Sequence, residues 1–353
     1  MLFTDYLKIN YAVEINMNPF DKEKSIRRVL NTIKKNRQNS RNLRIFNIFK
    51  YAAIALIGII ASTYFFKDEI FGVSNEVTPE IVNQNFIEPG TDKAILTIED
   101  GSKIKLVKGK SIQIQNASNT GNKLSYKSSP GTTKDIAYHS LNIPRGGQYF
   151  IKLSDGTNIW LNSETHLRYP VNFVEGETRQ VELIYGEAYF EVTPSTLFNG
   201  SRFKVVSQSQ EVEVLGTEFN IKAYKNENLT FTTLVKGKVD VNSKGVKHRL
   251  KPKQQLSFNL KTDQLDISFV DVFGEISWKD GIFSFEDKSL YDIMKVISRW
   301  YDIEVVFEDE NVKKEEFFGL LRKDQDLEKI MKTVKDYGII KNYEFEKKIL
   351  TIK

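Results

Sequence analysis

The sequence contains no cysteine and only three histidines among its 353 residues. A chain without cysteine forms no disulfide bond, so its stability does not depend on the redox state of its compartment. His139, His166 and His248 lie far apart in the sequence and lack the spacing of zinc ligands. We therefore expect no metal site, and burial of apolar side chains must stabilise the fold.

The sequence also lacks the common motifs of enzymes. It has no Gly-x-Ser-x-Gly motif, no P-loop and no dinucleotide-binding glycine pattern. We interpret Gly146-Gly147 as a turn, because no phosphate-binding helix follows it. Glu187 and Glu191 lie four apart on a predicted strand, where two carboxylates share a face and are usually solvated or capped. The sequence thus predicts a protein that is not an enzyme and needs no cofactor.

Long apolar runs are scarce, and one run stands out at residues 51–66, between Lys50 and Lys67. As a helix it would be about 24 Å long, a little short of the hydrocarbon core of about 30 Å. The flanking lysines can extend to the membrane surface and make up the difference. A buried core helix is the alternative, but such a helix normally keeps a polar face. We expect a single transmembrane helix over residues 50–67.

Charge predicts the orientation of this helix. Residues 1–50 carry eleven lysines and arginines against four aspartates and glutamates. The positive-inside rule places this basic segment in the cytoplasm and everything after residue 67 outside it. A cleaved signal peptide is less consistent with the sequence, because some fifty residues precede the apolar run. Residues 1–49 are then a short cytoplasmic segment, and residues 68–93 a linker.

The cytoplasmic segment contains one amphipathic pattern. Ile26, Val29, Leu30 and Ile33 have the i, i+3, i+4, i+7 spacing of one helix face, and the rest of the helix is basic. Basic clusters next to a membrane contact lipid headgroups, and they can also bind an acidic partner. We name these four apolar residues as candidate partner-binding residues and expect no direct contact with nucleic acid.

Residues 94–270 show short segments of alternating apolar and polar residues, separated by turn residues, which is typical of an all-β domain. Asp100-Gly101 and Asp155-Gly156 are each followed by apolar residues two apart, which predicts two hairpins with type I′ turns. We expect repeated β-hairpins in a solenoid- or sandwich-like arrangement. The expected core residues are Trp160, Leu161, Phe190, Val192, Leu215 and Phe219.

Residues 278–353 alternate between strand and helix patterns. Strands are predicted at 281–285, 304–307 and 316–321, helices at 289–300 and 326–335, and a closing hairpin at 338–346 and 349–352. This order predicts a small α+β domain with a doubled βαβ unit. Tyr343, Phe345 and Ile349 of the hairpin are candidate partner-binding residues at a sheet edge. The charged residues beside them equally suit an edge that is merely protected from pairing.

Five motifs in the central region resemble, in order, the FecR-type transmembrane anti-sigma regulators of Gram-negative bacteria. They are residues 143–173 (IPRGGQYFIKLSDGTNIWLNSETHLRYPVNF), 179–192 (RQVELIYGEAYFEV), 203–224 (FKVVSQSQEVEVLGTEFNIKAY), 232–241 (TTLVKGKVDV) and 250–256 (LKPKQQL). Lys253 stands where the family usually has glycine. Residues 278–353 are similar to the small secretin and TonB N-terminal signalling-type domain that many members of the family carry.

The resemblance implies a fold and a mechanism. The protein would cross the inner membrane once, with its N-terminus in the cytoplasm and its C-terminus in the periplasm. It would bind an extracytoplasmic-function sigma factor and sense the signalling domain of an outer-membrane TonB-dependent transporter. Family members usually have a longer, acidic cytoplasmic domain, so either the helix at 26–33 or residues 1–17 must supply the sigma-factor contact. The alternative is a membrane-anchored structural or glycan-binding periplasmic β-protein.

Overall fold

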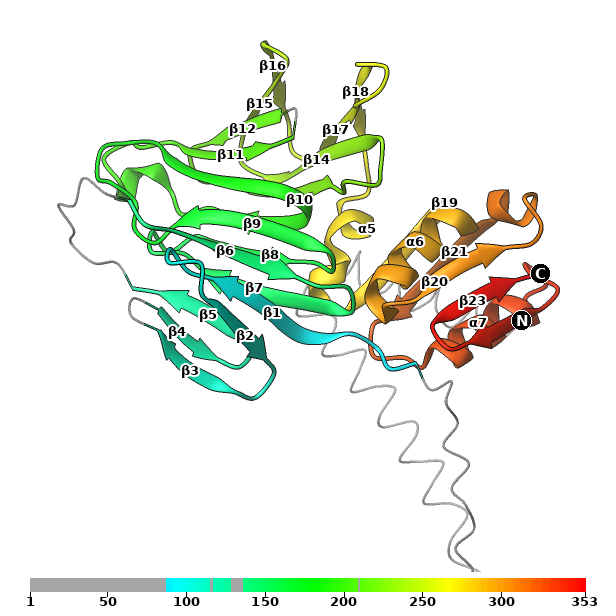
Figure 1. Ribbon diagram of the computed structural model, residues 1–353. Helices are drawn as coiled ribbons and strands as arrows, with labels where there is room; N and C mark the ends of the chain where they lie inside the picture. Colours follow the sequence, from blue (N-terminus) through cyan, green and yellow to red (C-terminus); the bar gives the residue numbers. More distant parts are fainter. Residues whose placement is uncertain (1–86, 115–116, 128–135, 209) are drawn as a thin grey trace, which may run out of the picture. The chain divides into compact units, whose positions relative to one another are not determined.

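The computed structural model describes residues 87–114, 117–127, 136–208 and 210–353 (Figure 1). The predicted helices at 26–33 and 50–67 lie outside these ranges. Within the described residues no helix is both long and apolar enough to cross a membrane. Residues 91–269 form strands, here called the β-domain, and residues 272–352 form a small module of helices and strands, the C-terminal module. A mainly β body with a small α+β part at its C-terminus is confirmed.

Two layers of strands build the β-domain. The first sheet has the order β2-β1-β6-β9-β10-β11-β12-β15-β16, and the second has the order β3-β4-β5-β7-β8-β10-β13-β14-β17-β18. The first sheet comprises β1 (Thr91–Thr97), β2 (Lys103–Val107), β6 (Tyr138–Ile143), β9 (Thr165–Pro170), β11 (Phe203–Ser207), β12 (Gln210–Val214), β15 (Val239–Ser243) and β16 (Val246–Leu250). The second comprises β3 (Ser111–Ile114), β4 (Ala117–Thr120), β5 (Lys123–Tyr126), β7 (Gly147–Lys152), β8 (Asn158–Leu161), β13 (Glu218–Ala223), β14 (Leu229–Lys236), β17 (Gln254–Asn259) and β18 (Leu265–Phe269).

Strand β10 (Arg179–Glu191) belongs to both sheets. Its first half pairs with β9 and β11, and its second half pairs with β8 and β13. The change of sheet occurs at Gly186, which has φ +107°. A Cβ atom at this position would lie 2.3 Å from Oγ1 of Thr165, so only glycine fits. β10 therefore ties the two layers together, and β1 does so at its first residues, where it pairs with β7.

The apolar core of the β-domain lies between the two sheets. Along each strand one side chain in two points inward, and these residues are almost completely buried. Phe190 and Phe219 stack here with ring centroids 4.9 Å apart. Successive hairpins extend the two sheets in turn. The hairpins β11–β12 and β15–β16 belong to the first sheet, and β13–β14 and β17–β18 belong to the second. The arrangement is thus sandwich-like and built from successive hairpins.

Both Asp-Gly hairpins are present, but their turn type differs from the prediction. A type I′ turn needs positive φ at both central residues, whereas here only Gly101 (φ +83°) and Gly156 (φ +84°) have it. In each turn the glycine N–H donates to the carbonyl of the residue three positions earlier. Gly101 donates to Ile98 and Gly156 donates to Leu153, both at 3.0 Å. Each loop is one residue longer than a type I′ hairpin, so the glycine takes the left-handed position after the turn.

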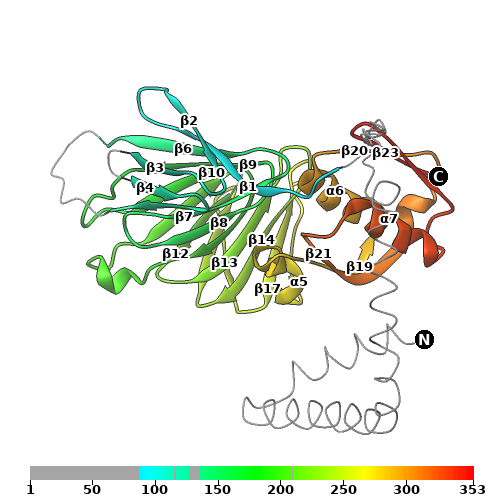
Figure 2. The same ribbon diagram turned by 90° about the horizontal axis from the view of Figure 1, so that it is seen from below.

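The C-terminal module contains three short helices, two 3₁₀ turns and five strands within the described residues. Its elements are α5 (Val272–Ile276), η2 (Ser277–Asp280), β19 (Ile282–Ser289), α6 (Leu290–Tyr301), β20 (Glu304–Phe307), η3 (Val312–Lys314), β21 (Glu316–Arg322), α7 (Leu327–Asp336), β22 (Tyr343–Glu346) and β23 (Ile349–Ile352). Ser289 caps α6 by accepting a hydrogen bond from the Asp292 N–H, and Asp326 caps α7 in the same way. Figure 2 shows α6 nearer than α7 to the strands of the β-domain.

The predicted order of strands and helices in the module is observed, but its strand pairing is not that of a doubled βαβ unit. The module has two separate sheets, β19-β21 and β20-β23-β22. Each helix carries the chain from one small sheet to the other, so the strands that flank a helix do not pair with each other. The βαβ prediction is therefore wrong in its pairing, although the class α+β stands.

Candidate functional site

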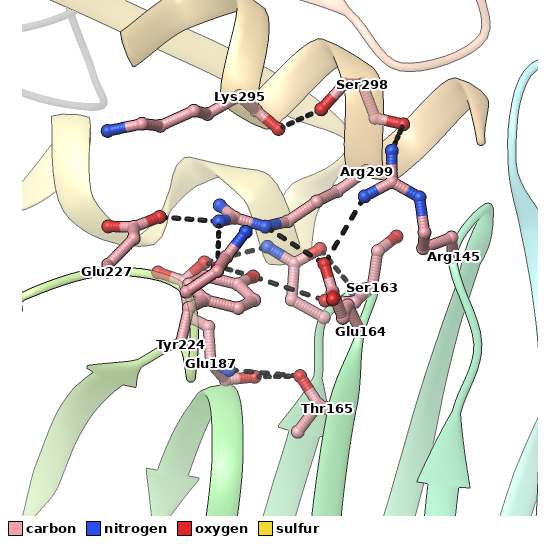
Figure 3. A network of polar contacts seen from close by, with 12 residues as sticks. Arg145, Ser163, Glu164, Thr165, Glu187, Tyr224, Glu227, Lys295, Ser298 and Arg299 are labelled. Carbon is pink, nitrogen blue, oxygen red and sulfur yellow. Dashed lines mark hydrogen bonds and ion pairs between the residues drawn. The ribbon is translucent and has the colours of Figure 1, made fainter. Parts of the chain in front are cut away.

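The C-terminal module packs against the outer face of the second sheet, and a polar network lines this contact (Figure 3). The centre of the network is Arg299 of α6, whose side chain is only 4% exposed. Its Nη2 donates to Oε1 of Glu227 at 2.6 Å, and its Nε lies 3.4 Å from Oε2 of Glu164. The guanidinium also stacks on the ring of Tyr224, 3.6 Å from the ring centroid. Arg299 thus joins two turns of the β-domain to one helix of the module.

A second arginine makes the converse contact, from the β-domain into the module. Arg145, in the turn between β6 and β7, donates from Nη2 to the carbonyl oxygens of Ser298 and Ile303, both at 2.7 Å. The Ser298 carbonyl belongs to the last turn of α6 and the Ile303 carbonyl follows shortly after the helix, where a cation is favoured by the helix dipole. Next to it, the Gly146 N–H donates to the Arg299 carbonyl at 2.7 Å. The Arg145 turn therefore caps α6 from the other domain.

Below Arg299 lies a buried carboxylate, Glu187 of β10. It accepts hydrogen bonds from the side-chain amides of Asn162 at 2.8 Å and Asn220 at 3.0 Å. Burial raises the pKa of Glu187 above that of an ordinary glutamate. A cavity of about 20 Å³, roughly the space of one water molecule, lies between this carboxylate and Arg299. Glu187 is therefore a part of the contact between the β-domain and the module. Glu191, the other glutamate of the predicted pair, instead accepts a hydrogen bond from the side chain of Asn158.

A buried lysine makes the third cationic contact. Lys323, which follows β21, is 4% exposed and donates from Nζ to Oε1 of Gln148 at 2.7 Å. Its Nζ lies 3.8 Å from the ring centroid of Trp300. Burial lowers the pKa of Lys323 to about 7. The ammonium is compensated chiefly by an amide oxygen and by aromatic faces, so no carboxylate among the described residues directly offsets the cost of burying its charge.

Aromatic side chains fill the rest of the contact. Trp160 of β8 meets Phe150 and Tyr189 edge to face, at centroid distances of 4.7 and 5.6 Å. It packs against the apolar cluster of the module and borders a second cavity of about 200 Å³, which Trp278 of the module also lines. Trp160 was expected in the core of the β-domain, but its strand position turns it to the outer face. The prediction for Leu215 is also wrong, because Leu215 is 52% exposed.

The structure does not bring the predicted site residues together here. Tyr343 and Phe345 lie on the edge strand β22, half-buried against the module, and the Tyr343 hydroxyl donates to Glu328 at 2.8 Å. Ile349 lies on β23, which is the middle strand of its sheet, so it is not at an edge. The predicted partner-binding residues of the cytoplasmic segment, Ile26, Val29, Leu30 and Ile33, lie outside the described residues.

Sequence reasoning missed the residues of the domain contact. The sequence analysis assigned no contact to Arg145, which precedes the Gly146-Gly147 turn, or to Arg299 in the predicted helix at 289–300. An arginine is costly to bury without a partner, but nothing in the residues next to Arg299 shows that it is buried, so the sequence gives no local signal of this contact. No group of three or more potential metal ligands occurs among the described residues.

Comparison with known proteins places this contact between two recognised domains. Residues 139–240 match the family model "FecR protein", and residues 282–352 match "FecR, C-terminal". Two crystal structures of a candidate anti-sigma factor from Parabacteroides distasonis ATCC 8503, at 1.65 and 2.50 Å resolution, are similar to the chain. Both are 27% identical and cover 61% of this chain and 98% of their own, with TM-scores of 0.55 and 0.54. No curated protein matches the sequence. The FecR resemblance drawn from the motifs is confirmed.

Proposed function

We propose that this chain, which carries both the FecR domain and the FecR C-terminal domain, regulates an extracytoplasmic-function sigma factor from the inner membrane. The observation that carries the proposal is the pair of domain matches in one chain, with a structural neighbour described as a candidate anti-sigma factor. In this proposal residues 1–49 lie in the cytoplasm, residues 50–67 span the membrane, and the described residues lie in the periplasm. The chain acts by binding and carries out no catalysis.

The proposed input is an outer-membrane TonB-dependent transporter, whose signalling domain binds the C-terminal module. Such a signal needs two states of the regulator that the transporter binds with different affinity, since equal affinity shifts no equilibrium. The contact through Arg299, Arg145 and Lys323 supports the proposal, because it joins the module to the β-domain by a few buried polar groups. A partner that binds the module can therefore alter the conformation of the β-domain. The β-domain follows the proposed membrane anchor in the chain.

The proposed output is a contact between the sigma factor and the apolar face of the cytoplasmic helix. Leu30→Asp and Ile33→Asp each place a charge on that face and should abolish co-purification of the sigma factor with the full chain. Asn31→Asp is the matched control, because it adds the same charge on the polar face and should leave capture unchanged. Capture that survives both apolar substitutions would move the contact to residues 1–17.

Two further measurements test the relay. Reporter fusions at residues 40 and 90 should be active in the cytoplasm and in the periplasm respectively, and the reverse pattern would refute the topology.

Deleting residues 278–353 should uncouple transport from transcription while the anchored β-domain stays folded. A truncated protein that still responds normally would show that the signal enters through the β-domain.

A further inference from the structure

Strand β21 (Glu316–Arg322) is an edge strand with an apolar face. Among the described residues it pairs only with β19, so its other edge carries no neighbouring strand. Phe318 is 69% exposed and Leu320 is 42% exposed on the outward face. Natural edge strands are usually protected by charged side chains, bulges or short length, because an apolar edge pairs readily with another strand. The open edge of β21 is therefore expected to pair with another strand.

The other small sheet of the module shows the protected case. Its edge strand β22 turns Glu344 and Glu346 outward, both exposed, while Tyr343 and Phe345 pack against the core of the module. An incoming strand at β22 would meet two carboxylates, whereas at β21 it would meet two apolar side chains. The two edges lie in one module and differ in chemistry, so the apolar character of β21 is a local feature rather than a property of the whole domain.

The central residues of β21 present free backbone pairing groups on that edge, whereas the N–H and carbonyl of Arg322 at its end already bond Gln325. At its two ends, the Glu315 carbonyl accepts from the Leu290 N–H at 2.7 Å, and the Lys323 N–H donates to the Gly281 carbonyl at 2.9 Å. Odd-numbered residues therefore point their backbone groups at β19. Since these groups alternate along an antiparallel strand, Phe318 and Leu320 point their N–H and C=O groups to the open edge.

The sequence of β21, Glu-Phe-Phe-Gly-Leu-Leu-Arg, is complementary to itself when reversed. If a second β21 runs antiparallel with Gly319 opposite Gly319, Glu316 faces Arg322 of the copy and Phe318 faces Leu320 of the copy. In this register the outward-pointing backbone groups of Phe318 and Leu320 also meet those of the copy, as hydrogen-bonded pairs. Opposite charges and apolar pairs facing each other across a strand pair are both stabilising.

We propose that two copies of this chain associate through β21, forming a four-stranded sheet β19-β21-β21-β19 about a twofold axis at Gly319. The interface is isologous, because each copy contributes the same strand. Arg322 is now held by Asp324 at 2.7 Å, with both side chains about two-thirds exposed or more, so exchanging this partner for Glu316 of the copy costs little. The association does not depend on the sigma factor or the transporter.

Site-directed cross-linking tests both the contact and its register. The chain has no cysteine, so single Glu316→Cys and Arg322→Cys variants of the full-length protein each carry one thiol. Oxidation of a mixture of the two variants should give a disulfide-linked dimer, while each variant alone should stay monomeric on a denaturing gel. In the proposed register Glu316 lies opposite Arg322 of the copy, whereas two copies of the same position lie far apart.

The matched control uses the protected edge. Glu344→Cys mixed with Glu346→Cys has equal thiol exposure on β22 and should give no dimer. Sedimentation of the full-length protein in detergent should show a dimer that Phe318→Lys converts to a monomer without changing its circular dichroism spectrum. A monomer across the whole dilution series, or cross-linking within each single variant at the same yield as in the mixture, would overturn the proposal.

Discussion

The interior of the β-domain and its outer face toward the C-terminal module are built from different chemistry. Between the sheets, most of the packing is apolar, with stacked rings such as Phe190 and Phe219, and the buried ion pair Arg179–Asp155, 2.8 Å long, lies at one end of β10. On the outer face, Arg299, Lys323 and Glu187 are buried together with aromatic rings. An apolar core tolerates any well-packed arrangement, whereas buried charges are stable only with particular partners. The core therefore gives stability, and the outer face selects one position of the module.

The largest effect is expected in the core. Phe190→Ala should lower the free energy of unfolding of a fragment of residues 87–353 by about 3–5 kcal/mol, because it opens a cavity between the sheets. Trp160→Ala should cost less, about 1–2 kcal/mol, because the ring lies on the outer face of the sheet and is only partly buried. Chemical denaturation of the two variants measures both losses of unfolding free energy. Equal losses would show that the module contact is as tightly packed as the interior.

The next effect distinguishes buried from exposed arginine pairs. Arg299→Ala should destabilise the module contact by about 3 kcal/mol, since it removes one of the two cations beside Glu164 and leaves Glu227 with only the longer ion pair to Lys222, 3.9 Å, in a partly buried site. Hydrogen exchange of the α6 amides is the measurement, and faster exchange is expected there than in β10. Arg249→Ala is the control, because Arg249 makes a two-bond pair with Asp240 on the surface. An equal effect at Arg249 would contradict the role given to burial.

A pH effect is expected at Lys323. Its folded-state pKa of about 7 lies below the ordinary 10.5, so between these values the unfolded chain binds more protons. Stability should therefore rise as the pH increases from 7 towards 10, and this gain should be fully lost below pH 7. Lys323→Met should flatten the slope in that window. Thermal unfolding at a series of pH values checks this, and an unchanged slope would mean that Lys323 is not desolvated.

The smallest effect is expected from the one histidine inside the β-domain core. His139 is hydrogen-bonded to the Tyr126 hydroxyl at 2.7 Å, and burial lowers the pKa of its ring below 6.5. As the pH falls below 6.5 the unfolded chain takes up a proton first, so stability should decrease. His139→Gln should remove part of this acid sensitivity. Melting temperatures at pH 5 and pH 7 give the comparison, and identical losses in both proteins would refute it.

Much of the chain's local structure was predictable. The predicted strands at 304–307 and 316–321 correspond to β20 and β21, and the two helices of the module begin within two residues of their predicted starts. Both Asp-Gly hairpins form, since the strand patterns on each side carry the pairing. These features depend on residues close in sequence, where alternation, capping and turn chemistry act directly.

The errors have a common cause. Trp160 alternates correctly with the inward Leu161, but alternation alone does not say which face of a sheet meets the core and which meets another domain. Ile349 was placed at an edge because it belongs to the last hairpin, whereas β20 pairs with β23 and covers it. Strand neighbours that are far apart in sequence decide both cases.

The sequence by itself determined the strands, the helices, the order of the FecR motifs and the absence of cysteine chemistry, because these follow from periodicity and composition. Only the tertiary structure decided that Gly186 lets β10 cross from one sheet to the other, and that Arg299 and Lys323 are buried against the β-domain. The physical reason is that burial of a charge depends on partners supplied by remote segments. No local pattern records where those partners will lie.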